Sequence, residues 1–326
     1  CRSNKPLLDE TKGKIALFCD VGKLDVLSNH DVESVYEVPL VMEDQGAGDN
    51  ILSKLNIKER NYDFVGWKKY IQKMKNVTEE VDIAIVGKYT DFKDSYISIV
   101  EALSHSSTTF NKKVKIRWVE SLELEENPKK IQELKNIDGI LVPGGFGQRG
   151  SEGKISAINF SRTNNIPYLG ICFGFQLAAI EYARNVLGLK GADSTELNPE
   201  TPYPIIDFLP EQRGIKQMGA TMRLGDLPIR IEKNTLAYKI YNKDEVGERH
   251  RHRYEVNPDY IKDFEKNGLE FSAKSLSGRR MEILEIPNHT HFLATQFHPE
   301  FKSRPMKPSP VFKAFVKAAI KKKGDA

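Results

Sequence analysis

Short apolar runs typical of β-strands alternate with helical patterns of apolar residues between residues 82 and 186. The predicted strands are residues 82–87, 114–119, 139–142 and 166–171. The predicted helices, which follow them in turn, are residues 95–104, 129–134, 156–163 and 174–186. Strands alternating with helices are typical of βαβ units, in which helices cover both faces of a parallel sheet. The sequence therefore predicts an α/β fold built on an open, mostly parallel sheet.

The pattern changes after about Thr195, where strand-like segments are separated by turns. This change predicts an antiparallel extension of the sheet. Residues 292–297 have the apolar pattern of a further strand, and residues 310–320 place Val311, Phe312 and Phe315 at helical spacing. We therefore expect a last amphipathic helix that packs on the core.

The first 80 residues do not follow this alternation. Residues 14–19 are predicted as an isolated strand, and the residues around Trp67 have helical spacing. We interpret the chain as a separate segment at residues 1–60, a linker at 61–80 and a main domain at 81–326. The chain begins with cysteine instead of methionine, so we expect a processed product or a fragment without its upstream part.

Composition excludes several classes of protein. Hydrophobic residues make up 39% and charged residues 29% of the chain, as in folded enzymes and unlike disordered chains. The 49 basic and 45 acidic residues leave a net charge of +4, too little to indicate a nucleic-acid partner. The apolar stretch at residues 166–180 is interrupted and shorter than the roughly 18 to 20 residues of a membrane span. Three cysteines without a pairing pattern, and no secretory signal, favour the cytoplasm.

Cys172 stands in the sequence Gly-Ile-Cys-Phe-Gly, between a predicted strand and a predicted helix. Glycines two positions away on either side allow the tight turn of a nucleophile elbow, which lifts the central side chain above the sheet. The helix that follows directs its positive end at Cys172 and favours the thiolate. A small cysteine packed in the core would also fit this pattern.

His298 and Glu300 are the candidate partners of this cysteine. In an extended segment they point to the same side, because side chains alternate along a strand. Glu300 would then orient His298, and His298 would exchange protons with Cys172. The alternative is a loop histidine beside Pro299, but the apolar strand pattern directly before it favours a functional role.

A glycine-rich stretch, Pro-Gly-Gly-Phe-Gly at residues 143–147, follows another predicted strand. Its backbone N–H groups, with that of Phe173, are candidate donors to an oxyanion. A plain turn or a phosphate loop is the alternative, although the Gly-Lys-Ser/Thr ending of a P-loop is absent from the sequence. All these segments follow the carboxyl ends of strands, the edge at which open α/β sheets bind ligands.

The run at residues 248–255 contains three arginines, two histidines and two glutamates. Alternation predicts Arg249, Arg251 and Arg253 on one face, where a guanidinium can bind a small carboxylate. A solvated strand face is the plainer interpretation. His250 and His252 have no nearby cysteine or third histidine in the sequence, so we predict no metal site.

With these motifs the chain resembles class I glutamine amidotransferases, and within that class the CTP synthase family. The elbow, residues 296–300 and residues 143–150 match the class. The stretches that narrow the resemblance to the family are residues 86–89, 150–153, 164–170, 221–225, 249–257 and 286–289. Residues 1–40 resemble the end of the family's synthetase domain, which makes residues 1–60 a remnant of that domain. The resemblance covers nearly the whole chain.

The resemblance implies a glutaminase reaction at a triad. Cys172 would attack the side-chain amide of glutamine, release ammonia and form a glutamyl thioester that water hydrolyses. His298 would act as acid and base, and Glu300 would orient it.

The resemblance also implies the substrate contacts. Gly145 and Phe173 would form the oxyanion hole, and Phe146 would lie against the aliphatic part of the substrate. Glu196 would meet the substrate ammonium group and Arg253 its carboxylate, as their charges suggest. The implied glutamine-binding residues are Gly145, Phe173, Gly174, Phe175, Gln176, Glu196 and Arg253.

In the family that the chain resembles, ammonia passes to a synthetase domain that uses ATP and Mg to aminate UTP to CTP, and GTP stimulates the use of glutamine. Lys14, His30, Asp31 and Val32 match nucleotide contacts of that domain. The phosphate-binding loop and the metal-binding acids of the family would lie upstream of Cys1. We therefore expect no cofactor in this chain and no CTP formation by it alone. The resemblance implies a homotetramer for the full-length enzyme.

The chain departs from the family pattern at three places. Phe173 replaces a more usual leucine, the segment 207–219 is short, and Ala220 follows Gly219 where a second glycine is usual. The candidate donor at position 173 is the backbone N–H, so the change to Phe should be tolerated.

Two other functions fit part of the sequence. One is an amidotransferase of another synthase, or a γ-glutamyl hydrolase, on the same fold; residues 1–40 and 249–257 argue against it. The other is a non-catalytic regulatory module, against which the set of Cys172, His298 and Glu300 argues.

Overall fold

The computed structural model describes residues 1–58, 63–208 and 222–324. The chain divides into two compact units, Cys1–Val77 and Thr78–Ala326. Most of the short segment 207–219, the pair Gly219 and Ala220, and the start of the predicted linker at residues 61–62 lie outside the described residues. None of the helices in the described ranges combines enough length and hydrophobicity to cross a lipid bilayer.

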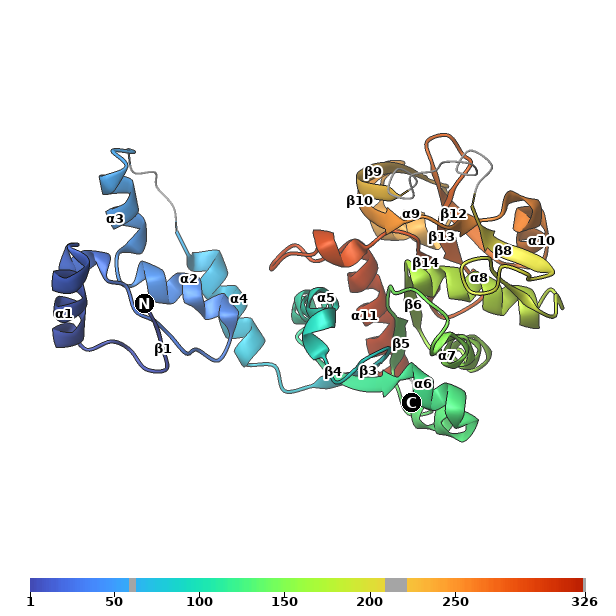
Figure 1. Ribbon diagram of the computed structural model, residues 1–326, viewed down its shortest axis with the longest axis horizontal. Helices are drawn as coiled ribbons and strands as arrows, with labels where there is room; N and C mark the ends of the chain where they lie inside the picture. Colours follow the sequence, from blue (N-terminus) through green and yellow to red (C-terminus); the bar gives the residue numbers. More distant parts are fainter. Residues whose placement is uncertain (59–62, 209–221, 325–326) are drawn as a thin grey trace. The chain divides into compact units, whose positions relative to one another are not determined.

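The first unit is mostly helical (Figure 1). Its elements are β1 (Arg2–Ser3), α1 (Asp9–Cys19), β2 (Asn29–His30), α2 (Val38–Glu43), α3 (Ala47–Lys54) and α4 (Val65–Lys75), with short 3₁₀ turns at Lys23–Asp25 and Val35–Glu37. β1 and β2 pair in parallel. α4 contains the helical spacing predicted around Trp67, buries Tyr70 and Ile71, and is tied to the unit by a hydrogen bond from Trp67 Nε1 to the carbonyl oxygen of Tyr36 (2.8 Å).

The strand predicted at residues 14–19 is wrong, because these residues form the second half of α1. Asp9 and Glu10 occupy the first turn, where negative side chains stabilise the positive end of a helix. Glu10 also forms an ion pair with Lys14 one turn later, at 2.7 Å. The polar residues at the start of α1 thus initiate the helix, and the apolar run from residue 15 to 19 continues it. The apolar run by itself does not distinguish a helix from a strand.

The second unit is built on a sheet with nine strands in the described residues. In spatial order they are β10 (Glu245–His252), β9 (Arg223–Ile231), β12 (Glu270–Ser275), β13 (Met281–Glu285), β14 (Phe292–Thr295), β6 (Tyr168–Ile171), β5 (Gly139–Val142), β3 (Glu80–Gly87) and β4 (Lys113–Glu120). The strands from β14 to β4 pair in parallel and those from β10 to β14 pair antiparallel. The predicted parallel sheet with an antiparallel extension is confirmed. A smaller sheet contains β11 (Glu255–Val256), β8 (Tyr203–Asp207) and β7 (Ala192–Ser194).

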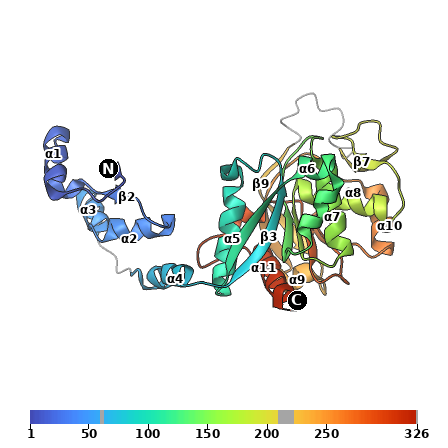
Figure 2. The ribbon, with the colours of Figure 1, turned by 90° about the horizontal axis from the view of Figure 1, so that it is seen from below.

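Helices cover both faces of the parallel part of the large sheet (Figures 1 and 2). The helices of this unit are α5 (Ile97–Thr109), α6 (Ser121–Glu126), α7 (Ser151–Thr163), α8 (Phe173–Asn185), α9 (Leu236–Tyr241), α10 (Ile261–Lys266) and α11 (Pro310–Gly324). Side chains alternate along β3, so Ile83 and Ile85 join the core beneath α5 and α11, whereas Ala84 and Val86 join the core beneath α7 and α8. The continuous apolar run of β3 therefore reflects a strand buried on both faces.

Predicted helix boundaries differ from the structure at several places; α5, for example, ends at Thr109 instead of residue 104. α7 begins at Ser151, earlier than predicted. Gly153 lies within this helix, where it allows close packing: a Cβ there would lie only 1.8 Å from the carbonyl oxygen of Ser121. Residues 128–134 form a 3₁₀ helix instead of an α-helix.

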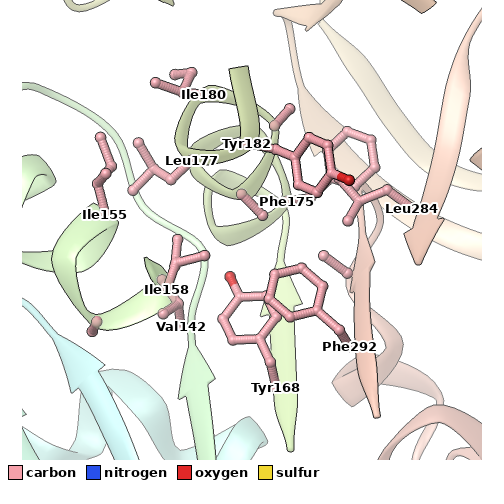
Figure 3. Packing of buried hydrophobic residues seen from close by; sticks show 14 of the residues in the cluster. Val142, Ile155, Ile158, Tyr168, Phe175, Leu177, Ile180, Tyr182, Leu284 and Phe292 are labelled. Carbon is pink, nitrogen blue, oxygen red and sulfur yellow. The ribbon is translucent and has the colours of Figure 1, made fainter. Parts of the chain in front are cut away.

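The core directly supports the turn that follows β6. The rings of Tyr168 and Phe292 stack across β6 and β14 with their centres 4.5 Å apart (Figure 3). The hydroxyl group of Tyr168 donates a hydrogen bond to the carbonyl oxygen of Gly174 at 2.9 Å. Packing within the core thereby fixes the first turn of α8 relative to the end of β6.

Candidate active site

Cys172 lies in the turn between β6 and α8. Its φ of 51° falls in the left-handed region, which is unfavourable for a residue with a side chain and is typical of strained functional turns. The neighbouring glycines permit this turn, since a Cβ would lie 2.2 Å from the carbonyl oxygen of Val142 at Gly174 and 2.6 Å from the Tyr168 hydroxyl at Gly170. The structure therefore contains the tight turn that the sequence predicts, with Cys172 at its centre.

His298 reaches Cys172 from the neighbouring strand. β14 pairs in parallel with β6, with Thr295 opposite Ile171, so the residues that follow both strands leave the sheet at the same edge. The Cys172 side chain is close enough to His298 to raise the pKa of the ring. Gly144 lies against both: a Cβ there would be 2.9 Å from His298 Cε1 and 3.6 Å from Cys172 Cβ. Three segments far apart in the sequence thus meet at one point.

Glu300 holds the other side of the His298 ring. Nδ1 of His298 lies 2.7 Å from Oε1 of Glu300, which leaves Nε2 for Cys172. The extended conformation predicted for residues 298–300 is wrong, because Pro299–Lys302 forms a 3₁₀ turn. The contact between the two side chains therefore comes from the geometry of the turn and not from strand alternation.

The electrostatics of His298 favour its protonated form. Burial by itself lowers the pKa of His298, but hydrogen bonds to Cys172 and Glu300, together with the attraction of their charges, raise it to about 10. Cys172 is the N-cap of α8, where the positive end of a helix stabilises a thiolate. The arrangement can therefore hold a thiolate beside an imidazolium.

The glycine loop at residues 143–147 packs beside the cysteine turn. Lys88 donates two hydrogen bonds of 2.8 Å from Nζ, to the carbonyl oxygens of Phe146 and Gly147, and so fixes the loop. A Cβ at Gly145 would lie 3.7 Å from the Phe173 ring, so the two predicted oxyanion residues are neighbours. The Phe146 side chain is 79% exposed.

Lys154 of α7 lies beneath this loop and was missed by the sequence analysis. Its side chain is 1% exposed, and Nζ lies 5.3 Å from the centre of the Phe173 ring. Burial, and to a smaller extent the charge of Lys88, lowers the pKa of Lys154 to about 7. A lysine within a helix is ordinarily exposed. The only sequence feature that pointed to Lys154 as a residue near the glycine loop was its position one turn after Gly150.

The predicted glutamine-binding residues of α8 divide into two groups. Phe175 points into the core (Figure 3), so only its backbone is available to a ligand. Gln176 faces the site, where its Nε2 donates to the carbonyl oxygen of Tyr254 (3.2 Å) and to Oε1 of Gln296 (3.3 Å). Gln296 in turn places its Nε2 3.9 Å from Sγ of Cys172. Gln296 is thus a second residue beside the thiol that was not singled out from the sequence.

Glu196 and Arg253 come from two loops that meet near the glycine loop. Glu196 accepts a hydrogen bond from the backbone N–H of Gly147. Burial raises the pKa of Glu196, against the opposing effects of that hydrogen bond and of the positive charges of Lys88 and Arg253. The two predicted contacts for the charged groups of a free amino acid are therefore near one another.

The shared face predicted for Arg249, Arg251 and Arg253 is only partly correct. Arg249 and Arg251 lie on the exposed face of β10, but the strand ends at His252 and Arg253 lies in the bend that follows. The change of direction at the strand end carries Arg253 away from the other two. This is why it can lie beside Glu196.

The buried face of β10 carries a charged cluster. Nδ1 of His250 lies 3.2 Å from Nε2 of His252 and 3.7 Å from Oε2 of Glu282, and ligand-type atoms of all three residues lie within 4.8 Å of one another. Arg223 pairs with the other oxygen of Glu282 at 2.8 Å, and burial lowers the pKa of His250 to about 3. Arg223 pairs with both Glu282 and Glu255, so we interpret the cluster as an ion-pair network. The absence of a metal here stays a prediction.

The residues predicted as nucleotide contacts all lie in the first unit. Lys14 is on α1 and pairs with Glu10, whereas His30 ends β2 and Asp31 and Val32 follow it directly. Asp31 pairs with Arg2. Their predicted role stays a prediction.

Comparison with known families and structures identifies the class of the protein. The model of the glutamine amidotransferase class-I family matches residues 91–318. The solved glutaminase domain of the Trypanosoma brucei CTPS, with bound acivicin, is 44% identical and superposes with a TM-score of 0.70 over 74% of this chain and 94% of that one. The chain belongs to the class I glutamine amidotransferase family.

The relatives of the chain within this class are CTP synthases. The model of the CTP synthase N-terminus matches residues 1–57. The CTP synthase of Thermococcus kodakarensis is 55% identical over 325 residues, and that of Pyrococcus abyssi is 56% identical over 321 residues. These alignments cover 99% and 98% of this chain but 60% and 59% of the two relatives, so the chain spans about three fifths of their length.

Proposed function

We propose that this chain hydrolyses glutamine at Cys172 and is the glutamine-using part of a CTP synthase. The observation that supports the proposal most strongly is that Cys172, at a strained turn before a helix, lies beside the hydrogen-bonded pair of His298 and Glu300. A buried structural cysteine needs neither the left-handed backbone nor the paired histidine.

In the proposed reaction the Cys172 thiolate attacks the side-chain amide carbon of glutamine. The imidazolium of His298 gives its proton to the departing nitrogen, so that ammonia leaves and a glutamyl thioester remains. His298 then takes a proton from water, the resulting hydroxide attacks the thioester, and glutamate and the cysteine are released. Glu300 keeps Nδ1 of His298 protonated and Nε2 directed at the sulfur throughout.

The developing oxyanion would be bound by the backbone N–H groups of Gly145 and Phe173. Glu196 would bind the ammonium group of the substrate and Arg253 its carboxylate, as the charges require. Gly174, Phe175 and Gln176 would surround the amide end from the first turn of α8. Phe146, exposed on the fixed glycine loop, would cover the methylene groups.

The proposal extends to the whole protein through its relatives. CTP synthases align with nearly the whole chain, so we propose that the ammonia serves to aminate UTP to CTP with ATP and Mg, and that GTP stimulates glutamine use. Lys14, His30, Asp31 and Val32 would belong to the nucleotide sites of that reaction. The full-length enzyme would be a homotetramer in the cytoplasm.

Release of glutamate from glutamine by the purified chain tests the catalytic proposal. We expect release by the wild type, none by Cys172→Ala, and full release by Cys19→Ala, a matched control at an exposed cysteine. The same samples test binding of acivicin, which occupies the Trypanosoma brucei relative. If the Cys172→Ala variant retains the wild-type rate, the nucleophile assignment is wrong; if the wild type neither turns over glutamine nor binds acivicin, this chain by itself is not a glutaminase.

A further inference from the structure

A groove of about 940 Å³ lies on the surface of the second unit. It lies between α9 and α11, beside the segment that leads into the start of β14. Its walls come from the end of α5, from α9, from residues 290–291 and from residues 306–321. We call it the lysine groove. Its volume is in the range of small-molecule sites in proteins.

The lysine groove is lined by positive charges that have no negative side chains beside them in the described part of the lining. Five lysines line it, from α9, from the segment before α11 and from α11 itself, and no acidic residue does so among the described residues. None of these lysines forms an ion pair with a described carboxylate, whereas Arg117, Arg184 and Lys302 do so elsewhere in the second unit. Their charges are therefore left for a ligand or for solvent.

The arrangement of lysines on α11 is unfavourable for the helix alone. Lys313, Lys317 and Lys321 follow one another at intervals of four residues on one face, where like charges repel. Lys313 also lies in the first turn, where the helix dipole disfavours a positive charge. The helix dipole favours the positive charge of Lys321, which lies near the carboxyl end of α11. The dipole therefore accounts for one of the three lysines but not for the other two. A bound anion would relieve both effects.

His291 supplies a second and independent indication of a ligand. Its side chain is 3% exposed and lines the groove, and Nε2 has no hydrogen-bond partner. Burying a polar nitrogen without a partner is unfavourable, and such groups are rare in folded proteins. A phosphate oxygen in the groove would supply the missing hydrogen bond.

We propose that the lysine groove binds a small polyphosphate ligand with an apolar body. The phosphates would lie along Lys313, Lys317 and Lys321 and accept a hydrogen bond from His291. The body would pack on the apolar wall that Leu236 and Ile240 provide from α9. None of its lining residues is a proposed catalytic or glutamine-binding residue, so the proposal is independent of the proposed glutaminase reaction.

Calorimetric titration of the 326-residue chain with tripolyphosphate and with ATP, at low salt and without Mg, tests the proposal. We expect both to bind the wild type and ATP to bind more tightly, because only ATP has an apolar body. The triple variant Lys313→Gln, Lys317→Gln and Lys321→Gln should lose about tenfold or more in affinity for both. The variant His291→Phe should weaken binding and keep the ring that packs near Phe315.

A matched triple variant separates a site from general attraction of anions. Lys129→Gln, Lys135→Gln and Lys190→Gln remove the same charge from exposed positions outside the groove, and they should leave both affinities unchanged. An ¹⁵N-histidine spectrum gives a direct readout, in which the Nε2 resonance of His291 should shift on addition of tripolyphosphate. The proposal is overturned by absence of binding, by equal loss in both triple variants, or by equal affinity for tripolyphosphate and ATP. Glutamate release in each variant reports separately on the proposed function.

Discussion

The amino group of Lys154 lies 5.3 Å from the centre of the Phe173 ring, directly beneath the residue that follows Cys172. A Cβ at Gly145 would lie 3.5 Å from the same amino group. Lys154 is thus buried between the two candidate oxyanion residues. Its charge, which depends on pH near neutrality, acts on the place where negative charge would develop.

We expect Lys154→Met to change the pH dependence of glutamine hydrolysis. Burial lowers the pKa of Lys154 to about 7, so the wild-type amine is positive below that pH and neutral above it. The positive form would stabilise the oxyanion, so the variant should lose about threefold to tenfold in kcat below pH 7 and approach the wild type above pH 8. Rates measured from pH 5.5 to 9 test this, with Lys129→Met as the control. A constant ratio of rates across this range would contradict it.

The same substitution should make the protein more stable. The pKa of Lys154 is about 7 in the folded state against the ordinary 10.5, so its burial destabilises the protein fully below pH 7 and progressively less as pH rises toward 10.5. Lys154→Met removes this cost, with an expected gain of roughly 2 kcal/mol in the free energy of unfolding at pH 6 and little at pH 10. Urea unfolding at the two pH values measures the difference, and a loss of stability at pH 6 would show that the ammonium group is favourably bound.

The sequence predicted most of the scaffold because its signals are local. The strand patterns, the glycines around Cys172 and the strand before His298 each act over a few residues, and the structure contains all three. Lys154, Gln296 and the pair of His250 with Glu282 could not be predicted in the same way, since burial and long-range contacts define them. The strand predicted at residues 14–19 failed for a related reason: the run is apolar, but the residues before it decide its conformation.

We expect alanine substitutions at two adjacent glycines, Gly144 and Gly145, to differ strongly in their effect on kcat. A Cβ at Gly144 would lie 2.9 Å from the His298 ring, closer than real Cβ contacts, so Gly144→Ala should displace the ring and reduce kcat about 100-fold. A Cβ at Gly145 meets only ordinary contacts at 3.5 and 3.7 Å, and alanine keeps the backbone N–H. Gly145→Ala should therefore stay within about threefold of the wild type. Equal losses in the two variants would refute the proposed approach of His298 to Gly144.

Glu300→Gln should make the protonated form of His298 less stable. Hydrogen bonds to Cys172 and Glu300 raise the pKa of His298 to about 10 from the ordinary 6.5, so this group adds stability fully below pH 6.5 and loses that effect as pH rises through 10. Without the Glu300 charge the variant should be roughly 1 kcal/mol less stable at pH 6, and the difference should shrink toward pH 10. We also expect at least a tenfold lower kcat, since the ring loses its charged partner. Unfolding curves and initial rates on the same samples test both effects.

Arg253 and Arg249 provide a matched pair for the substrate carboxylate. Arg253 lies in the bend after β10, close enough to the half-buried Glu196 for its charge to oppose the rise in pKa that burial causes there, whereas Arg249 lies on the exposed face of the strand. A free amino acid offers one ammonium and one carboxylate group, which this pair of opposite charges would bind together. Removing Arg253 takes away a contact made equally in the ground state and the transition state, so Arg253→Ala should raise the KM for glutamine at least tenfold and change kcat less. Arg249→Ala removes the same charge from the neighbouring strand face and should leave KM unchanged. If both variants raise KM equally, the arginines act through general attraction of the anionic group, and the substrate carboxylate must be bound elsewhere.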